Sequence, residues 1–395
     1  MTGTGYTEIS ESLKRDYLPV LQKQIEKKVK TWDIFGKSGE GIRGRDLYIK
    51  NFYGFPQGVG PKAAEATLPT PSASKFKESQ ISVKRNYAVV AFDAMLDEEK
   101  NSIVDLIDFE MTAAEDSLQK ELNYQLAYGD GTGQRAVVNG TVTTTTVVAV
   151  DLPDGRPGVD FLAADMYIDL GTGVLDKKIA SVDSDTQITL AEAVSCNDNT
   201  VIYRSGAKDV TMMGIPGIVL NNGALQGITE SWWVSKAYDK GAKWGTNDAT
   251  FLDSIQEAVD YVRYNSNGQI DLIYAWPLFA RQYRYAMEAK RRIVNTLKFK
   301  EGREGLSYVT EEGEISILSE PYLPWLKVFF LDSSKLEMRT LRGIHWEEKD
   351  GSILRFLERK DIFTAWLKLY AEFITTQRNA HAYWYNTGTT VGDYT

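Results

Sequence analysis

The stretch Asp97–Gly133, DEEKNSIVDLIDFEMTAAEDSLQKELNYQLAYGDGTG, joins a long helical pattern to a glycine turn. Carboxylates at Glu98 and Glu99 suit the positive end of a helix dipole, and no Gly or Pro follows before Gly129. We predict one helix that reaches roughly 45 Å at 1.5 Å per residue. Its apolar positions recur every three or four residues, which gives a single apolar face: Ile103, Ile107, Met111, Ala114, Leu118, Leu122 and Leu126.

The glycine turn Gly129–Gly133 superficially suggests a phosphate-binding loop. A phosphate loop precedes a helix, however, whereas this turn follows one. Glycines here permit positive φ at the C-terminal cap, and Asp130 and Thr132 can bond to the turn backbone. We therefore predict a helix stop. The helix cannot cover its own apolar face, so it must lie on a sheet or on other helices.

An extended arm is expected upstream of the helix. Residues Ile81–Ala91 alternate between apolar and polar side chains, which indicates a half-buried strand. Before it, Asn51–Lys75 is rich in Gly, Pro and Ala and offers little for a core. A projecting two-stranded ribbon is marginally stable in water, so it is expected to lie against something else, such as a neighbouring subunit.

An inserted all-β domain is predicted between Val137 and Arg204. This region is built from Val, Thr, Asp and Gly in short alternating runs that are separated by turn signals. Such a pattern favours a small β-barrel or sandwich on the surface. The predicted strands are Thr141–Val150, Met166–Leu170, Ile179–Val182, Gln187–Leu190 and Val201–Tyr203.

A mixed pattern returns after the insertion. Phe251–Tyr264 reads as an amphipathic helix, Asp271–Ala275 as a buried strand, and Pro277 as the first turn of a second helix. From Glu314 to Thr375 the pattern is that of strands, the clearest being Lys327–Leu331, Leu336–Arg339, Ile353–Glu358 and Phe363–Phe373.

Composition excludes several classes of protein. A chain of 395 residues exceeds the size of a single core, so two or three subdomains are expected. The net charge of −9 argues against a general nucleic-acid binder. No apolar run approaches the roughly 20 residues of a membrane span, and no signal peptide is visible. The single cysteine, Cys196, excludes an internal disulfide and is expected to be structural.

The search for chemical motifs is largely negative. The two histidines, His345 and His381, have no second ligand at metal-binding spacing, and packing or surface roles are expected for them. No nucleophile elbow, phosphate loop or dinucleotide fingerprint is present. The acidic run Glu311–Glu314 is expected to be a solvated turn rather than a carboxylate pair or ion site. We therefore expect no enzyme activity, no cofactor and no bound metal.

The order of these features resembles that of the major capsid proteins of tailed bacteriophages, which have the Hong Kong 97 type fold. The resemblance covers a basic amphipathic segment at Ile9–Val29, an extended loop that ends in Lys84–Ala88, the long helix and the Gly-Asp-Gly-Thr-Gly turn. In such proteins a Gly-Ile step closely follows that turn. Here the step comes only at Met213–Ile218, after the predicted insertion.

The resemblance implies an α+β capsid fold with an inserted small all-β domain. Its expected parts are an N-terminal arm (1–45), an extended β-hairpin loop (46–92), the spine helix of a peripheral domain (93–136), the inserted β domain (137–206), an axial domain (207–312), and peripheral return strands with the C-terminal part of the axial domain (313–395). In particular, the family places strands such as Lys327–Leu331 in the peripheral domain beneath the spine helix.

The implied function is self-assembly into hexamers and pentamers of an icosahedral head that encloses double-stranded DNA. This implies a virion protein, assembled in the bacterial cytoplasm without a membrane, that meets a portal protein and contacts the packaged DNA non-specifically. A cement or decoration protein is a further partner of this class. Because the chain begins at Met1 and has no long coiled-coil leader, a separate scaffolding protein or none is expected.

Two alternatives remain open at this stage. An encapsulin-like nanocompartment shell protein shares the implied fold, although the length, the β insertion and the N-terminal arm favour the virus. A carbohydrate-binding surface protein is suggested by the aromatic content, but the sequence offers no compelling carboxylate pair across a cleft.

Several residues are candidates for contacts between subunits. Aromatic residues concentrate in desolvated contacts, and cations can meet acidic residues of a neighbour. Some related capsids join a loop lysine to an asparagine covalently, for which Asn379 and Asn386 are the nearest candidates; we expect noncovalent contacts instead. The candidate contact residues are Lys62, Lys75, Lys77, Arg85, Lys290, Arg291, Arg292, Trp232 and Trp233.

Overall fold

The computed structural model describes most of the chain. The described residues are 31, 34–39, 42–43, 46–64, 66–93, 103–239, 248–289, 296–298, 304–311, 313–348, 353–356 and 362–385. The expected N-terminal segment Ile9–Val29 and the cations Lys290–Arg292 lie outside them, as does Asn386. Within the described residues the chain forms a closed barrel and three open sheets of five, seven and three strands.

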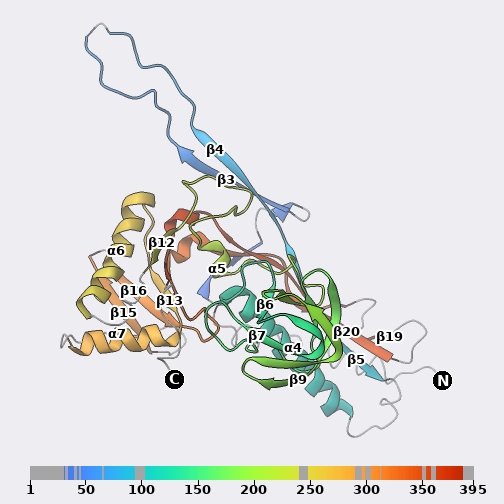
Figure 1. Ribbon diagram of the computed structural model, residues 1–395. Coiled ribbons are helices and arrows are strands. Elements are labelled where there is room, and N and C mark those ends of the chain that lie inside the picture. The colour runs from blue at the N-terminus through green and yellow to red at the C-terminus, as the bar shows by residue number, and fades with distance from the viewer. Residues whose placement is uncertain are drawn as a thin grey trace.

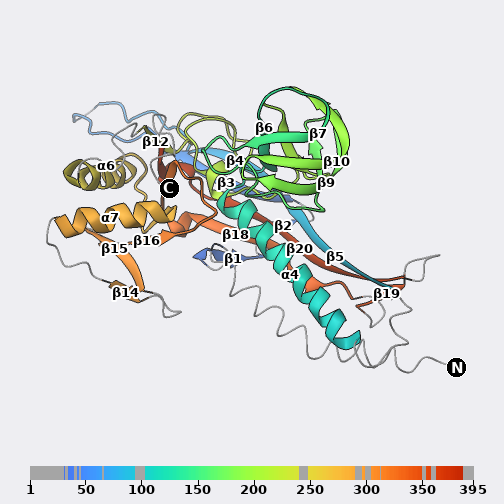
Figure 2. The same cartoon turned by 60° about the horizontal axis from the view of Figure 1, so that its bottom comes forward.

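The long helix is α4 (Ile103–Ala127), whose 25 residues span about 37 Å. It lies along the five-stranded sheet, as Figure 2 shows. Among the described side chains of its predicted apolar face, Met111, Leu118, Leu122 and Leu126 are at most 2 % exposed. They share one hydrophobic cluster with inward side chains of the sheet. The sheet contains β1 (Gly36–Ser38), β18 (Leu336–Trp346), β20 (Ile362–Thr375), β19 (Arg355–Phe356) and β5 (Lys84–Asp93), the last paired with β20.

The glycine turn ends α4 as predicted. The Gly129 amide donates to the Tyr124 carbonyl at 2.9 Å, and the Thr132 amide donates to Asp130 Oδ1 at 3.0 Å. Gly133 has a φ of 83°, a conformation that favours glycine. Gly214 of the Gly-Ile step packs against the end of α4. A Cβ at this position would lie 2.2 Å from the carbonyl oxygen of Gln125, so only glycine fits. The short helix α5 (Ile215–Ile218) follows it.

The seven-stranded sheet carries two helices. Its order is β12 (Lys236–Asp239), β21 (Ala382–Tyr385), β17 (Lys327–Leu331), β13 (Leu272–Ala275), β16 (Gly313–Ser319), β15 (Glu304–Thr310) and β14 (Thr296–Lys298). The helices α6 (Asp248–Ser266) and α7 (Pro277–Ala289) match the predicted pair, with Pro277 in the first turn. The described residues also form two 3-10 turns, η4 (Ser333–Lys335) and η5 (Arg378–Ala380).

One strand takes a different place from the one expected. Lys327–Leu331 was expected beneath the long helix, but as β17 it pairs antiparallel with β13 in the seven-stranded sheet. Its alternate side chains serve two cores. Phe329 joins the cluster of α4, whereas Phe330 joins the cluster of α6 and α7. A strand buried on both faces carries no sequence signal for its partner, so this expectation rested on the resemblance and not on the pattern.

The inserted region is a closed six-stranded barrel, one of the two all-β forms that the pattern favoured. Its first strand was not among the five predicted strands and begins before the predicted boundary at Val137. The strands are β6 (Gln134–Val138), β7 (Val142–Asp151), β8 (Tyr167–Leu170), β9 (Val174–Ser184), β10 (Gln187–Cys196) and β11 (Val201–Arg204), in the order β10-β7-β6-β11-β8-β9 with β9 paired to β10. Its core is its own, and Ile168, Ile179, Ile188 and Ile202 are fully buried in it. Cys196 ends β10 and is partly exposed.

A long hairpin projects from the body (Figure 1). It is formed by β3 (Asp46–Gly54) and β4 (Lys75–Ser82), with β2 (Ile42–Arg43) on the outer edge of β3. The predicted strand Ile81–Ala91 is in fact divided at Val83, since β4 belongs to the hairpin sheet and β5 to the five-stranded sheet. Val83 is the one residue between β4 of the hairpin sheet and β5 of the five-stranded sheet.

Candidate assembly surface

One face of the hairpin is lined with exposed aromatic rings. Side chains alternate along β3 and β4, so Leu47 and Ile81 face the body while even-numbered residues face outward. Tyr48, Phe52, Phe55 and Phe76 are 48 %, 43 %, 74 % and 60 % exposed, and we call these four residues the aromatic ridge. The ring centroids of Phe52 and Phe76 are 5.4 Å apart, and those of Phe52 and Phe55 are 4.8 Å apart.

The tip of the hairpin continues this apolar surface. Between Gly54 and Lys75 the side chains of Val59 and Leu68 are 85 % and 81 % exposed. The two legs of the tip nevertheless touch, because the Gln57 amide donates to Ser72 Oγ. Exposed apolar side chains gathered on a projection are typical of a surface that a partner covers.

The loop lysines lie on or near this projection. Lys62 is exposed in the tip and Lys75 is exposed at the start of β4. Lys77 is engaged within the chain, because its Nζ lies 2.7 Å from Glu230 Oε1. This contact raises the pKa of Lys77 through the hydrogen bond to Glu230.

The tryptophan pair faces two environments. Trp232 is half-buried and stacks on Tyr53 of the hairpin, with ring centroids 4.8 Å apart. Trp233 is 2 % exposed and belongs to the core cluster of this chain. Its indole therefore offers no surface to another subunit, and sequence could not distinguish the two neighbours.

A second exposed apolar surface lies on the five-stranded sheet. Tyr87 and Val89 of β5 are 49 % and 60 % exposed, and Leu341 of β18 is 50 % exposed. The predicted contact residue Arg85 stands on the same side of β5 as Tyr87, and its guanidinium lies 5.8 Å from the centre of the Tyr370 ring. Aromatic and arginine side chains of this kind are enriched in interfaces between proteins.

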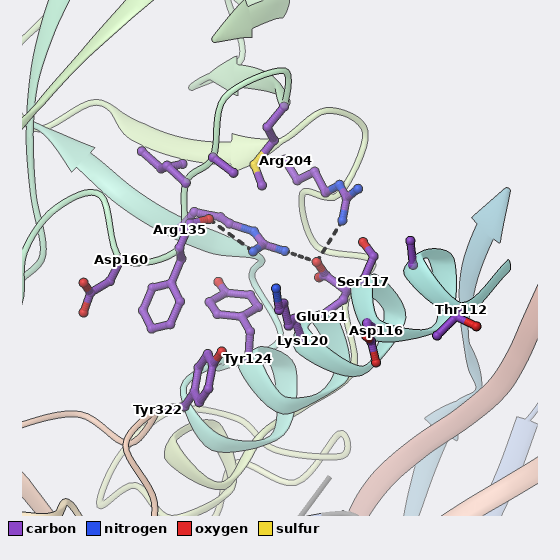
Figure 3. A pocket seen from close by; sticks show the side chains of 15 residues that line it. Thr112, Asp116, Ser117, Lys120, Glu121, Tyr124, Arg135, Asp160, Arg204 and Tyr322 are labelled. Carbon is purple, nitrogen blue, oxygen red and sulfur yellow. Dashed lines mark hydrogen bonds and ion pairs between the residues drawn. The ribbon is translucent and has the colours of Figure 1, made fainter. Parts of the chain in front are cut away.

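A cavity of about 520 Å³ separates α4 from the barrel (Figure 3). Arg135 of β6 and Arg204 of β11 both reach the carboxylate of Glu121 on α4, the latter at 3.0 Å. Burial alone would raise the pKa of Glu121, but the charges of Arg135 and Arg204 and a hydrogen bond from Gln125 lower it. The carboxylate stays ionised and fastens the barrel to the helix.

A second contact attaches the barrel beside this cavity. Arg156 donates to the carbonyls of Pro321 and Leu323 at 2.8 and 2.9 Å. Asp154 accepts from the amide of Trp325 at 3.0 Å. The barrel is therefore attached by Glu121 and by the connection between β16 and β17.

Two buried titratable groups keep neutral forms. Burial raises the pKa of Tyr124, which lines the cavity, so its phenol stays protonated. Burial lowers the pKa of His381 to about 4, and this neutral ring accepts from the Asp332 amide at Nδ1. In the ranges that the structure describes, no group of three or more His, Cys, Asp or Glu could hold a metal ion. No helix in those ranges is both long and apolar enough to cross a membrane.

Sequence reasoning missed part of this surface. Tyr48 and Phe52 lie on one side of β3, but the run Tyr48-Ile49-Lys50-Asn51-Phe52 does not alternate between apolar and polar residues, so the aromatic ridge had no period-two signal. Glu230 gave no signal either, because its partner lies 153 residues away.

Comparison with known proteins finds similarity of structure but not of sequence. No family model matches the chain, and no curated protein matches it in sequence. Among solved structures, the capsid of cyanophage A-1(L) aligns with 94 % of this chain and 94 % of its own, at 12 % identity and a TM-score of 0.48.

Two further structures align over similar lengths. The capsid of the Myoviridae phage XM1 covers 89 % of this chain and 90 % of its own, at 8 % identity and a TM-score of 0.46. The SrpI encapsulin of Synechococcus elongatus PCC 7942 covers 91 % and 88 %, at 9 % identity and a TM-score of 0.45. Two of these three matched structures are phage capsids, and the third is an encapsulin.

Proposed function

We propose that this chain is a structural subunit of a closed protein shell, and specifically the major capsid protein of a tailed bacteriophage. The observation that carries the proposal is the aromatic ridge, which stands on a projection and is left in solvent by its own chain. A monomer gains nothing from such a surface, whereas a neighbouring copy can cover it.

Burial of the apolar surface of the hairpin can supply enough free energy for assembly. If a neighbour covers about 400 Å² of its apolar surface, the gross gain is about 10 kcal/mol per subunit. Ordering the tip and docking the subunits remove much of that gain. Because each contact is repeated around a closed shell, a small net gain per contact is enough.

The same geometry bears on two alternative functions. A carbohydrate-binding role for the tryptophan pair is disfavoured, because Trp233 is buried and Tyr53 covers one side of Trp232. An encapsulin-type shell would use the same hairpin surface and would differ in its contents. Nuclease-protected DNA inside natural particles supports the phage capsid, whereas an enclosed protein supports the encapsulin-type shell.

The proposal is tested by electron microscopy of the full chain expressed alone, beside a variant without the tip. Deleting Gly58–Pro71 and joining Gln57 to Ser72 preserves β3 and β4, because these two residues already touch. We expect closed polyhedral shells from the native chain and a folded, unassembled subunit from the variant. A native chain that stays monomeric when supplied with varied salt and crowding agents would contradict unaided assembly, and shells from both chains would contradict the role of the tip.

A further inference from the structure

The hairpin is held on its inner side by a loop that is distant in sequence. Residues 219–235, here called the latch loop, follow α5 and precede β12. Three contacts join them to the hairpin: the Lys77–Glu230 ion pair at 2.7 Å, the stack of Tyr53 on Trp232, and a hydrogen bond of 3.3 Å from the Gln80 amide to the Gln226 carbonyl. The three contacts spread along β3 and β4.

The latch loop is itself anchored in the body. Arg378 of η5 is 1 % exposed, and its guanidinium donates to three carbonyls of the loop and its approach: Ile218 at 2.8 Å, Asn222 at 2.9 Å and Gly223 at 2.9 Å. Asn379 donates to the carbonyl of Trp232 at 3.0 Å. The loop is thus a rigid bracket, because charged donors to carbonyls are among the stronger hydrogen bonds.

Among the described residues, the apolar contact between the hairpin and the body is small. Val83 is the one residue between β4 and β5, and the hydrophobic contact at the base consists of Leu47, Ile81 and Ile374 with Ile49 beside them. A cavity of about 190 Å³ lies under this base, lined by Gln80–Ser82, Lys84 and Gln226 among others. The nine residues of β3 form a lever of about 30 Å. A rotation of about 10° at Val83 would therefore move the end of β3 by about 5 Å.

We propose that the latch loop sets the angle of the hairpin, and that Lys77, Glu230 and Trp232 are the positioning residues that thereby fix the curvature of the shell. The inference about curvature rests on the proposed function, whereas the latch itself is a property of the single subunit. Exposed ion pairs contribute little to the free energy of unfolding. We therefore assign to the Lys77–Glu230 pair the orientation of the hairpin rather than the stability of the fold.

Charge exchange tests the latch in the unassembled full chain. Lys77→Glu opposes Glu230, and hydrogen exchange of the amides in 76–82 and 224–233 should accelerate about twofold to fivefold. The double variant Lys77→Glu/Glu230→Lys should return both segments to the native rate. Lys75→Glu makes the same charge change two residues away and should leave both segments unaltered. Unaltered exchange in Lys77→Glu, or equal acceleration in Lys75→Glu, would overturn the latch.

Electron microscopy of the same variants tests the consequence for curvature. Lys77→Glu and Trp232→Ala should give shells with a shifted or broadened distribution of diameters, and the double charge exchange should restore the native diameter. Native diameters in both single variants, despite faster exchange, would overturn the link to curvature. If the native chain forms no shell, the proposed function and the curvature inference fail together, while the exchange rates still decide whether the latch exists.

Discussion

The barrel and the hairpin are both insertions into the path of the chain, but they satisfy their apolar side chains in opposite ways. The barrel closes its strands on themselves and buries a complete core of its own. The hairpin has only a small hydrophobic contact at its base and leaves four aromatic rings in solvent. A closed barrel also has no free edge, whereas a projecting ribbon does. The barrel therefore needs no partner to bury its core, whereas the proposed function assigns the exposed rings of the hairpin to a neighbouring subunit.

Removing the aromatic ridge should have the largest effect. Phe52→Ser/Phe76→Ser loses about 3–6 kcal/mol of apolar burial per contact if a neighbour covers both rings. The subunit concentration needed for assembly should then rise at least about 100-fold, as measured by light scattering. The melting temperature should stay near the native value, because both rings are exposed in the subunit.

The barrel supplies the control for this change. Tyr167 is 53 % exposed on β8, so Tyr167→Ser removes a ring of similar exposure from the other region. Assembly of this variant should match that of the native chain. Equal loss of assembly in both variants would show that exposed rings in general, rather than the ridge, drive association.

Removing core volume from the barrel should destabilise the barrel alone. Ile188 is fully buried there, and Ile188→Ala should cost about 2–5 kcal/mol. Native-state hydrogen exchange should accelerate in β6–β11 and remain unaltered in α4 and β20. Equal acceleration in α4 would mean that the barrel and the body unfold as one unit.

The two regions should also respond to pH in opposite directions. Glu372 beneath the hairpin base is fully buried, and burial raises its pKa to about 8. Since an unfolded glutamate titrates near 4.5, the folded state keeps a proton that the unfolded state has lost, and stability falls by up to about 1.4 kcal/mol per pH unit between about 4.5 and 8.

Glu121 beneath the barrel has a lowered pKa, so its contribution is present above about 4.5 and disappears as the pH falls through the folded value. Denaturant melts from pH 3 to 9 check both trends. Glu372→Gln should remove the decline above pH 4.5 and leave the acid limb unaltered. An unaltered decline in Glu372→Gln would assign that decline to another group.

Local pattern predicted those parts of the molecule that local forces build. The helix α4, its glycine stop, the helix that begins at Pro277 and five of the six barrel strands follow from periodicity and turn residues within short windows, whereas β6 was not predicted. The division at Val83 was not readable, because apolar residues recur at odd positions from Ile81 to Ala91, whereas the buried positions change from Ile81 and Val83 to Asn86 and Val90.

Contacts between distant segments were beyond sequence reasoning. The Lys77–Glu230 pair, the anchoring of the latch loop by Arg378 and the partner of β17 each join segments far apart in the chain. Charged residues in a sequence read as solvated faces, so nothing marked Arg378 as a buried donor to three carbonyls. The same limit applies to Trp232 and Trp233, whose different environments depend on the fold.

The most direct test of the central claim is oxidative footprinting of the ridge before and after assembly. Hydroxyl radicals modify exposed aromatic rings, so Tyr48, Phe52, Phe55 and Phe76 should react readily in the unassembled subunit and at least about fivefold more slowly in closed shells. Tyr167 on the barrel serves as the internal reference. Undiminished modification of all four ridge residues in closed shells would contradict the claim that a neighbouring subunit covers the hairpin.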